Sequence, residues 1–215
     1  MSSRRSLRIN LSKVRPMSAM DRHRVENARR LMKLLDRDPL HAEQVRFIAL
    51  RLFDGLKKLH GLGEEYRDCL EAASLLHDIG YSRGSAGHHK HSALLIVDRG
   101  IDGFNRRELR IVAFTARYHR KGGPKKSHAD FAALPRADRT VIGKLSAMLQ
   151  IADGLDRSHR SVIRDLTASI NKSSVHLDLI ASTPVDVEIG GMAKKSGLFE
   201  EVFGKTILTG VSGLP

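Results

Sequence analysis

The chain has 215 residues, of which 41% are hydrophobic and 28% are charged. This length suits one domain with a sizeable core, or a main domain with a small appendage. No apolar run approaches the roughly 18 residues that a membrane span requires. The lone Cys69 excludes an internal disulfide framework and is typical of a reducing compartment, so we expect a cytoplasmic protein. The formal net charge of +13 favours a polyanionic partner or substrate, and non-specific nucleic acid is one candidate.

The N-terminal third predicts an arm followed by three helices. Residues 1–20 are basic, polar and without periodicity, and they predict a flexible arm. Apolar residues then recur every three or four positions, first over 21–36, then from His41 to Leu59, and again over 64–76. His41 lies on the apolar face of the second helix, where a polar group needs an internal partner. The third helix ends in the doublet His77-Asp78.

The middle third carries further polar residues at the ends of apolar helices. His91 has a helical relation to Leu94 and Leu95, so we expect it to point inward, with His88 at the entrance. A helix over 106–119 ends in His119. A helix over 139–156 places Asp153 beside an apolar stripe, where an acid is costly unless it is paired or bound to a cation.

The character of the sequence changes after Ala168. Alternating apolar residues predict strands over 174–182, 185–189 and 206–211, with a short helix over 196–203. We therefore predict a mainly α fold, with a helical bundle over 21–168 and a small α/β appendage over 169–215. The appendage is expected either to pack against the body or to mediate a homodimer.

The inward-facing polar residues together predict a metal centre. They are His41, His77, Asp78, His91, His119 and Asp153. Imidazoles and carboxylates without thiolates suit one or two divalent ions, among them Mn, Fe, Mg, Ni and Zn. In a two-ion arrangement Asp78 bridges, His41, His77 and Asp153 complete one shell, and His91 and His119 serve the other. A metal-activated hydroxide would then attack phosphorus, with His77 and Asp78 at the catalytic centre.

Other polar residues have two interpretations each. Five basic residues and no acid fall within 117–126, and Arg117, Arg120, Lys121 and Lys125 either clamp substrate phosphates or form a solvated loop. Asp156 either orients a ligand imidazole or forms a surface ion pair with Arg157 or Arg160. His88 is assigned a supporting position near the ligands.

Several segments carry a resemblance to a known family. They are HAEQVRFIALRLFDGLKKLHGL, AASLLHDIGY, HHKHSALLI, ARYHRKGGPKK and KLSAMLQIADGLDRSH. The order of His41, His77-Asp78 and Asp153 resembles the HD superfamily of metal-dependent phosphohydrolases. More narrowly, roughly residues 40–160 look like the C-terminal HD domain of the exopolyphosphatase and guanosine pentaphosphate phosphatase family. The resemblance implies an HD-domain helical bundle, with His91 and His119 where binuclear members place their extra ligands.

The sequence also departs from that family. Its members have their principal active site in N-terminal ATPase-like domains, and no glycine-rich phosphate loop occurs in this chain, so that activity is not carried over. The segment Arg120 to Pro124 differs from the Gly-Tyr-Pro signature of cyclic-di-guanylate phosphodiesterases. We expect a phosphohydrolase acting on a phosphorylated small molecule, a nucleotide or polyphosphate. The alternative is a non-catalytic module that binds polyphosphate or nucleic acid on an HD scaffold.

Overall fold

The computed structural model describes residues 19–120 and 122–213. Its helices, in chain order, are α1 (Ala19–Leu35), α2 (Pro39–Gly55), α3 (Lys57–His60), α4 (Glu65–Leu76), the 3-10 helix η2 (Ile79–Arg83), α5 (His88–Arg99), α6 (Arg106–Arg117), α7 (Ala129–Ala132), α8 (Arg136–Gly154), α9 (Asp186–Ala193) and α10 (Gly197–Phe203). The strands are β1 (Ile163–Ile170), β2 (Ser174–Ala181) and β3 (Thr206–Gly213). The prediction of a mainly α fold with a small α/β appendage is confirmed. The predicted N-terminal arm lies, as far as residue 18, outside the described residues.

Helix α4 forms the centre of the helical body. Every residue from Asp68 to Leu76 is buried, as expected for a helix that other helices surround. Helices α1, α2, α6 and α8 all contact it. The chain therefore delivers whatever follows Leu76 directly into the interior of the body.

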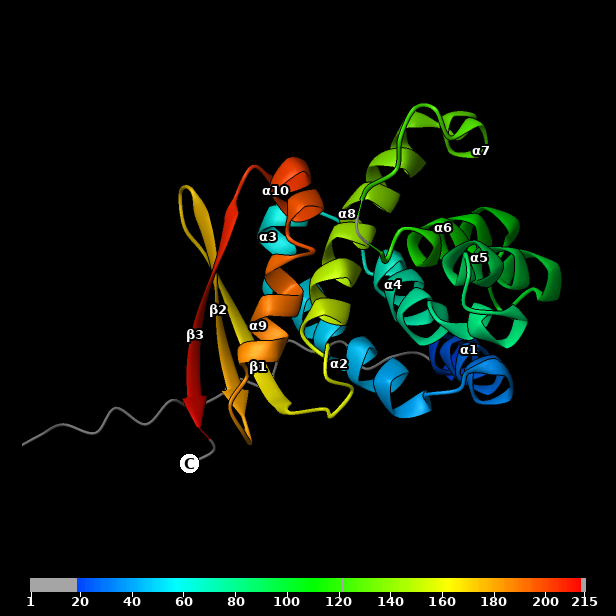
Figure 1. Ribbon diagram of the computed structural model, residues 1–215. Helices are drawn as coiled ribbons and strands as arrows, with labels where there is room; N and C mark the ends of the chain where they lie inside the picture. Colours follow the sequence, from blue (N-terminus) through cyan, green and yellow to red (C-terminus); the bar gives the residue numbers. More distant parts are fainter. Residues whose placement is uncertain (1–18, 121, 214–215) are drawn as a thin grey trace, which may run out of the picture.

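The three strands form one sheet at a flank of the molecule, in the order β1-β2-β3 (Figure 1). Strands β1 and β2 are antiparallel, with Leu166 opposite Leu179, whereas β2 and β3 are parallel, with Leu177 opposite Thr209. The connection between the parallel strands runs through α9 and α10, which pack on α8. This crossover brings the C-terminal helices against the body.

Two predictions for this region need correction. The segment 185–189 is not a strand, because Val185 caps α9 and the residues from Asp186 onward form that helix. A short apolar run does not distinguish a strand from a helix by its periodicity alone. The sheet also begins at Ile163, so the boundary placed at residue 168 falls inside β1. The sheet and the helical body therefore join earlier in the chain than expected.

The remaining features of the core fit a structural role. Cys69 lies fully buried in α4, and burial raises the pKa of its thiol to about 12. A thiol in that state is neither a good nucleophile nor a ready metal ligand. Within the described part of the chain, no helix is both long enough and apolar enough to cross a membrane.

Candidate metal centre

The doublet His77-Asp78 is fixed by contacts with the first turns of α5. The Ser92 hydroxyl donates to the carbonyl oxygen of His77 (2.6 Å) and accepts from the backbone N–H of Gly80 (2.9 Å). A Cβ atom on Gly80 would lie 2.0 Å from the carbonyl oxygen of His88, so only glycine allows this approach. The glycine after the doublet thus brings α5 close enough for His88 to reach the centre.

A first group of candidate ligands comprises His41, His77 and Asp153, whose ligand atoms all lie within 4.8 Å of one another. His41 Nε2 is 3.6 Å from Asp153 Oδ1. His41 stands in the first turn of α2, where its backbone N–H donates to the capping carboxylate of Asp38 (3.2 Å). Three separate helix ends, those of α2, α4 and α8, therefore converge on one point.

A second group comprises Asp78, His88 and His119. The Nε2 atoms of His88 and His119 each lie 3.4 Å from Asp78 Oδ1. The other oxygen, Asp78 Oδ2, is 3.5 Å from His77 Nε2 of the first group. One carboxylate thus faces both groups, as a ligand shared by two cations would.

The four imidazoles present the same nitrogen to the centre. Each Nδ1 donates outward to an oxygen, from His41 to Asp156 Oδ2 (2.8 Å), from His77 to Ser74 O (2.7 Å), from His88 to Ser85 O (3.1 Å) and from His119 to Ala116 O (2.7 Å). These bonds fix the orientation of the rings and aim every Nε2 inward. All four rings are nearly inaccessible to solvent.

Charge in the centre is balanced within the protein. Burial lowers the pKa of His119 to about 3, so this ring is neutral. Burial also disfavours the charged form of His41, but the carboxylates of Asp153 and Asp156 outweigh burial and raise its pKa to about 10. Burial opposes ionisation of Asp78, yet the neighbouring imidazole of His77 holds its pKa below the usual range. A cation at the first group would therefore displace a proton from His41.

Two buried atoms at the centre have no hydrogen-bond partner among the described residues, namely His77 Nε2 and Asp78 Oδ1. A buried polar group in this state is costly unless something else satisfies it. The buried His60 differs, because its Nε2 donates to Phe53 O (2.8 Å) and its Nδ1 accepts from Leu62 N–H (2.9 Å). The doublet therefore fits a cation, whereas His60 is an ordinary core histidine.

The structure brings together five of the six predicted ligands, and His88 stands in the place given to His91. The inward face of α5 carries His88, Ser92, Leu95 and Ile96. His91 was placed inward by its spacing from Leu94 and Leu95; Leu95 is buried, but Leu94 is 53% exposed and His91 is only partly buried. Outside both groups, His91 lies about one helical turn farther along α5 than His88.

The predicted substrate residues lie around a basic cavity of about 230 Å³. Its lining comprises His89, Lys90, Arg117, Tyr118, Arg120, Gly122, Gly123, Lys125 and His128. Lys121, also predicted to contact substrate, lies outside the described residues. Asp156 is fully buried and accepts from His41 Nδ1, so it is no partner of a surface arginine. The cavity adjoins the second group, because the His89 ring centroid is 5.7 Å from that of His88.

Three residues near the centre were not identified from the sequence. Lys195 forms an ion pair with Asp153 Oδ2. The His159 ring stacks on His41 with centroids 3.8 Å apart and pairs with Asp38 (2.8 Å). Burial raises the pKa of Asp36, whose Oδ2 has no hydrogen-bond partner in the described part of the chain. Asp36 ends the expected helix over 21–36, one turn after Met32, and His159 follows Asp156 by three residues, so the sequence offers a signal for both. Lys195 has no such signal, because it lies in a polar segment.

A comparison with protein families agrees with this geometry. The model described as Ppx/GppA phosphatase, domain III, matches residues 23–187. This chain belongs to the Ppx/GppA phosphatase family. The match covers both candidate ligand groups, and it ends within α9, before Lys195. Membership in Ppx/GppA gives the chain a phosphatase-related function, and its two His/Asp groups suit the metal dependence that is general in the family.

Proposed function

We propose that the protein is an HD-type, metal-dependent phosphohydrolase that binds two divalent cations and cleaves a phosphate ester or anhydride in the cytoplasm. The observation that carries this proposal is the pair of adjoining ligand groups around Asp78, with every imidazole Nε2 directed inward. Nitrogen and carboxylate oxygen donors without thiolate suit Mn, Fe, Mg, Ni or Zn.

The residues of the centre divide into two sets of metal ligands and one carboxylate that faces both sets. His41, His77 and Asp153 would hold one cation, and His88 and His119 would hold the other, with Asp78 between them. When bound, such ions supply Lewis acidity and lower the pKa of a water molecule to near neutrality. The outward hydrogen bonds of the imidazoles keep the donors in place before any substrate arrives, so little reorganisation is needed.

The basic cavity is the proposed binding site for the substrate's phosphates. Arg117, Arg120 and Lys125 come from the end of α6 and the loop that follows, next to His119. Arginine offers two parallel donors to phosphate oxygens, whereas lysine supplies a compact charge. A polyphosphate or nucleotide substrate would therefore place its scissile group beside the second cation and its remaining phosphates in the cavity.

Metal content combined with turnover tests the proposal. We expect freshly purified protein to contain close to two equivalents of divalent metal by elemental analysis, and to hydrolyse polyphosphate, pyrophosphate or generic phosphoesters. The variant His77→Ala should lose metal and turnover together, since it removes a ligand of the first group. The variant His60→Ala is the matched control for loss of a buried imidazole that has no free nitrogen. Metal-free protein that nevertheless turns over substrate would refute the proposal.

The alternative function, a non-catalytic polyphosphate-binding module, is favoured by one observation, the basic cavity beside the centre.

If the protein is the proposed enzyme, the variant Arg120→Met should raise KM for polyphosphate about ten-fold, because one charge-assisted contact is lost. Arg110→Met is the control, since Arg110 is exposed on α6 and does not line the cavity. The phosphohydrolase hypothesis and the binding-module hypothesis both predict that Arg120→Met binds polyphosphate more weakly, as measured by titration calorimetry. Only binding without turnover, unaffected by His77→Ala and Asp78→Ala, supports the module.

A further inference from the structure

Lys195 connects the candidate metal centre to the C-terminal helices. It lies between α9 and α10, beyond the residues that the family model matches. Its ammonium pairs with Asp153 Oδ2, while the other oxygen, Asp153 Oδ1, faces His41 Nε2 at 3.6 Å. The two side chains are 18% and 13% exposed. The Asp153 carboxylate therefore binds the Lys195 ammonium through one oxygen and directs its other oxygen toward His41 of the first ligand group.

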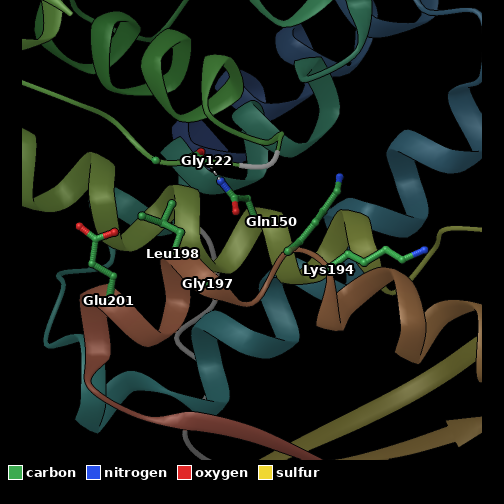
Figure 2. A pocket seen from close by; sticks show the side chains of 8 residues that line it. Gly122, Gln150, Lys194, Gly197, Leu198 and Glu201 are labelled. Atoms are coloured by element: carbon green, nitrogen blue, oxygen red, sulfur yellow. Dashed lines mark hydrogen bonds between the residues drawn. The ribbon is translucent and has the colours of Figure 1, made fainter. Parts of the chain in front are cut away.

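Lys195 also lines a cavity of about 260 Å³, here called the glycine-lined cavity. Its lining residues are Gly122, Gly123, Gln150, Lys194, Lys195, Gly197, Leu198 and Glu201 (Figure 2). Gly122 and Gly123 also line the basic cavity, so this short segment separates the two spaces. Both cavities therefore adjoin the candidate metal centre, one through His89 and the other through Lys195.

The wall of the glycine-lined cavity is held in place from two sides. Gln150 Nε2 donates to the carbonyl oxygens of Gly122 (2.9 Å) and Tyr118 (2.7 Å). A Cβ atom on Gly123 would lie 2.6 Å from Leu198 Cδ1, the flexible end of a side chain that can shift. Gly122 has a φ of +98°, and this is the position in the loop that requires glycine.

Charge is distributed unevenly along this cavity. The two lysines contribute positive charge, and the single carboxylate of the lining, Glu201, is exposed. Figure 2 shows Glu201 and Lys194 at opposite ends of the group of lining residues. The end that carries Lys194, which Lys195 follows in the chain, is therefore the end suited to an anion.

We propose that the glycine-lined cavity is a second phosphate subsite, in which Lys195 passes from Asp153 to a phosphate group of the substrate when the first ligand group takes up its cation. This inference rests on the proposed function, because it assigns a subsite to the same reaction. The physical reason is charge: a divalent ion beside Asp153 repels the ammonium, whereas a phosphate in the cavity attracts it. The scissile phosphate then lies between two basic cavities, so a substrate with anionic groups on both sides of the cleaved bond is preferred.

The test uses titration calorimetry of the full-length protein, with Mn²⁺ added to metal-free protein and with pyrophosphate, supplied as its non-hydrolysable methylene analogue, added to Mn²⁺-saturated protein. Lys195→Met should bind Mn²⁺ about ten-fold more tightly, because a competing positive charge is removed. In an Arg120→Met background, which weakens the other cavity, Lys195→Met should bind pyrophosphate about ten-fold less tightly. Lys195→Arg should retain both wild-type affinities, and Lys194→Met should retain the wild-type Mn²⁺ affinity, since Lys194 has no ion pair with Asp153 among the described contacts.

The opposite signs of the two effects separate this role from a structural one. Weaker or unchanged Mn²⁺ binding in Lys195→Met, or unchanged pyrophosphate binding, would overturn the proposal. Lys195→Gln is a second neutral variant, and failure of both neutral variants to fold would assign Lys195 to the fold instead. Absence of Mn²⁺ binding in the wild type would contradict the proposed function, whereas normal wild-type binding matched by Lys195→Met would contradict the subsite alone.

Discussion

Asp78→Asn is expected to remove both cations and to reduce turnover by at least about 10³-fold. Asp78 is the carboxylate that faces both ligand groups, with Oδ1 near His88 and His119 and Oδ2 near His77. Asparagine keeps the shape but lacks the negative charge that offsets two divalent ions. Elemental analysis and the initial rate of phosphate release measure the two effects.

A matched control and a stability measurement sharpen this prediction. Asp98→Asn makes the same chemical change on α5, where the carboxylate side chain is 59% exposed. It should leave metal content and turnover at wild-type levels. In metal-free protein near neutral pH, Asp78→Asn should unfold at a lower temperature than the wild type, because a carboxylate whose pKa is lowered in the folded protein stabilises the fold when it is ionised. Two retained metal equivalents in Asp78→Asn would show that Asp78 is not the shared ligand.

Much of this fold could be predicted because local pattern and packing agree. The expected helices over 64–76 and 106–119 correspond to α4 and α6, since apolar residues recur there at helical spacing. Strand β2 was likewise predicted by alternation. The helix α9 could not be predicted in this way, because the short alternation of apolar residues in its segment is typical of a strand. In the structure this segment is helical and packs against α8.

The candidate site could be predicted where a polar residue interrupts an apolar face. His41, His77 and Asp153 each stand out for that reason, and the structure places them in one group. Lys195 could not be found in this way, because it reaches Asp153 only through the crossover between β2 and β3. A lysine in a polar turn carries no signal that distinguishes it from a solvated one.

The choice between His88 and His91 depended on where α5 begins. Helix α5 starts at His88 itself, after Gly87 with a φ of +69°, so the first imidazole of the run faces the doublet. The sequence favours His91 because its spacing from Leu94 and Leu95 is helical, but of these two leucines only Leu95 is buried. The predicted ligand, His91, is one helical turn away from His88, and it therefore lies outside both ligand groups.

His88→Ala is therefore expected to lose the second cation while the first is retained, and His91→Ala is expected to lose neither. The Nε2 atom of His88 lies 3.4 Å both from Asp78 Oδ1 and from His119 Nε2, whereas His91 belongs to neither ligand group. Because a ligand is removed outright, the affinity of the second site should fall by more than the roughly 10- to 100-fold typical of losing an outer partner.

Stepwise Mn²⁺ titration of metal-free protein distinguishes the two variants, since each changes one imidazole of the same helix. His88→Ala should show one binding step where the wild type and His91→Ala show two, and its turnover should fall along with the second step. The reverse result, with His91→Ala losing a step and His88→Ala keeping both, would restore the assignment made from the sequence and would require α5 to turn about its axis when metal binds. The number of cations bound by each variant therefore tests which histidine of α5 faces the metal centre.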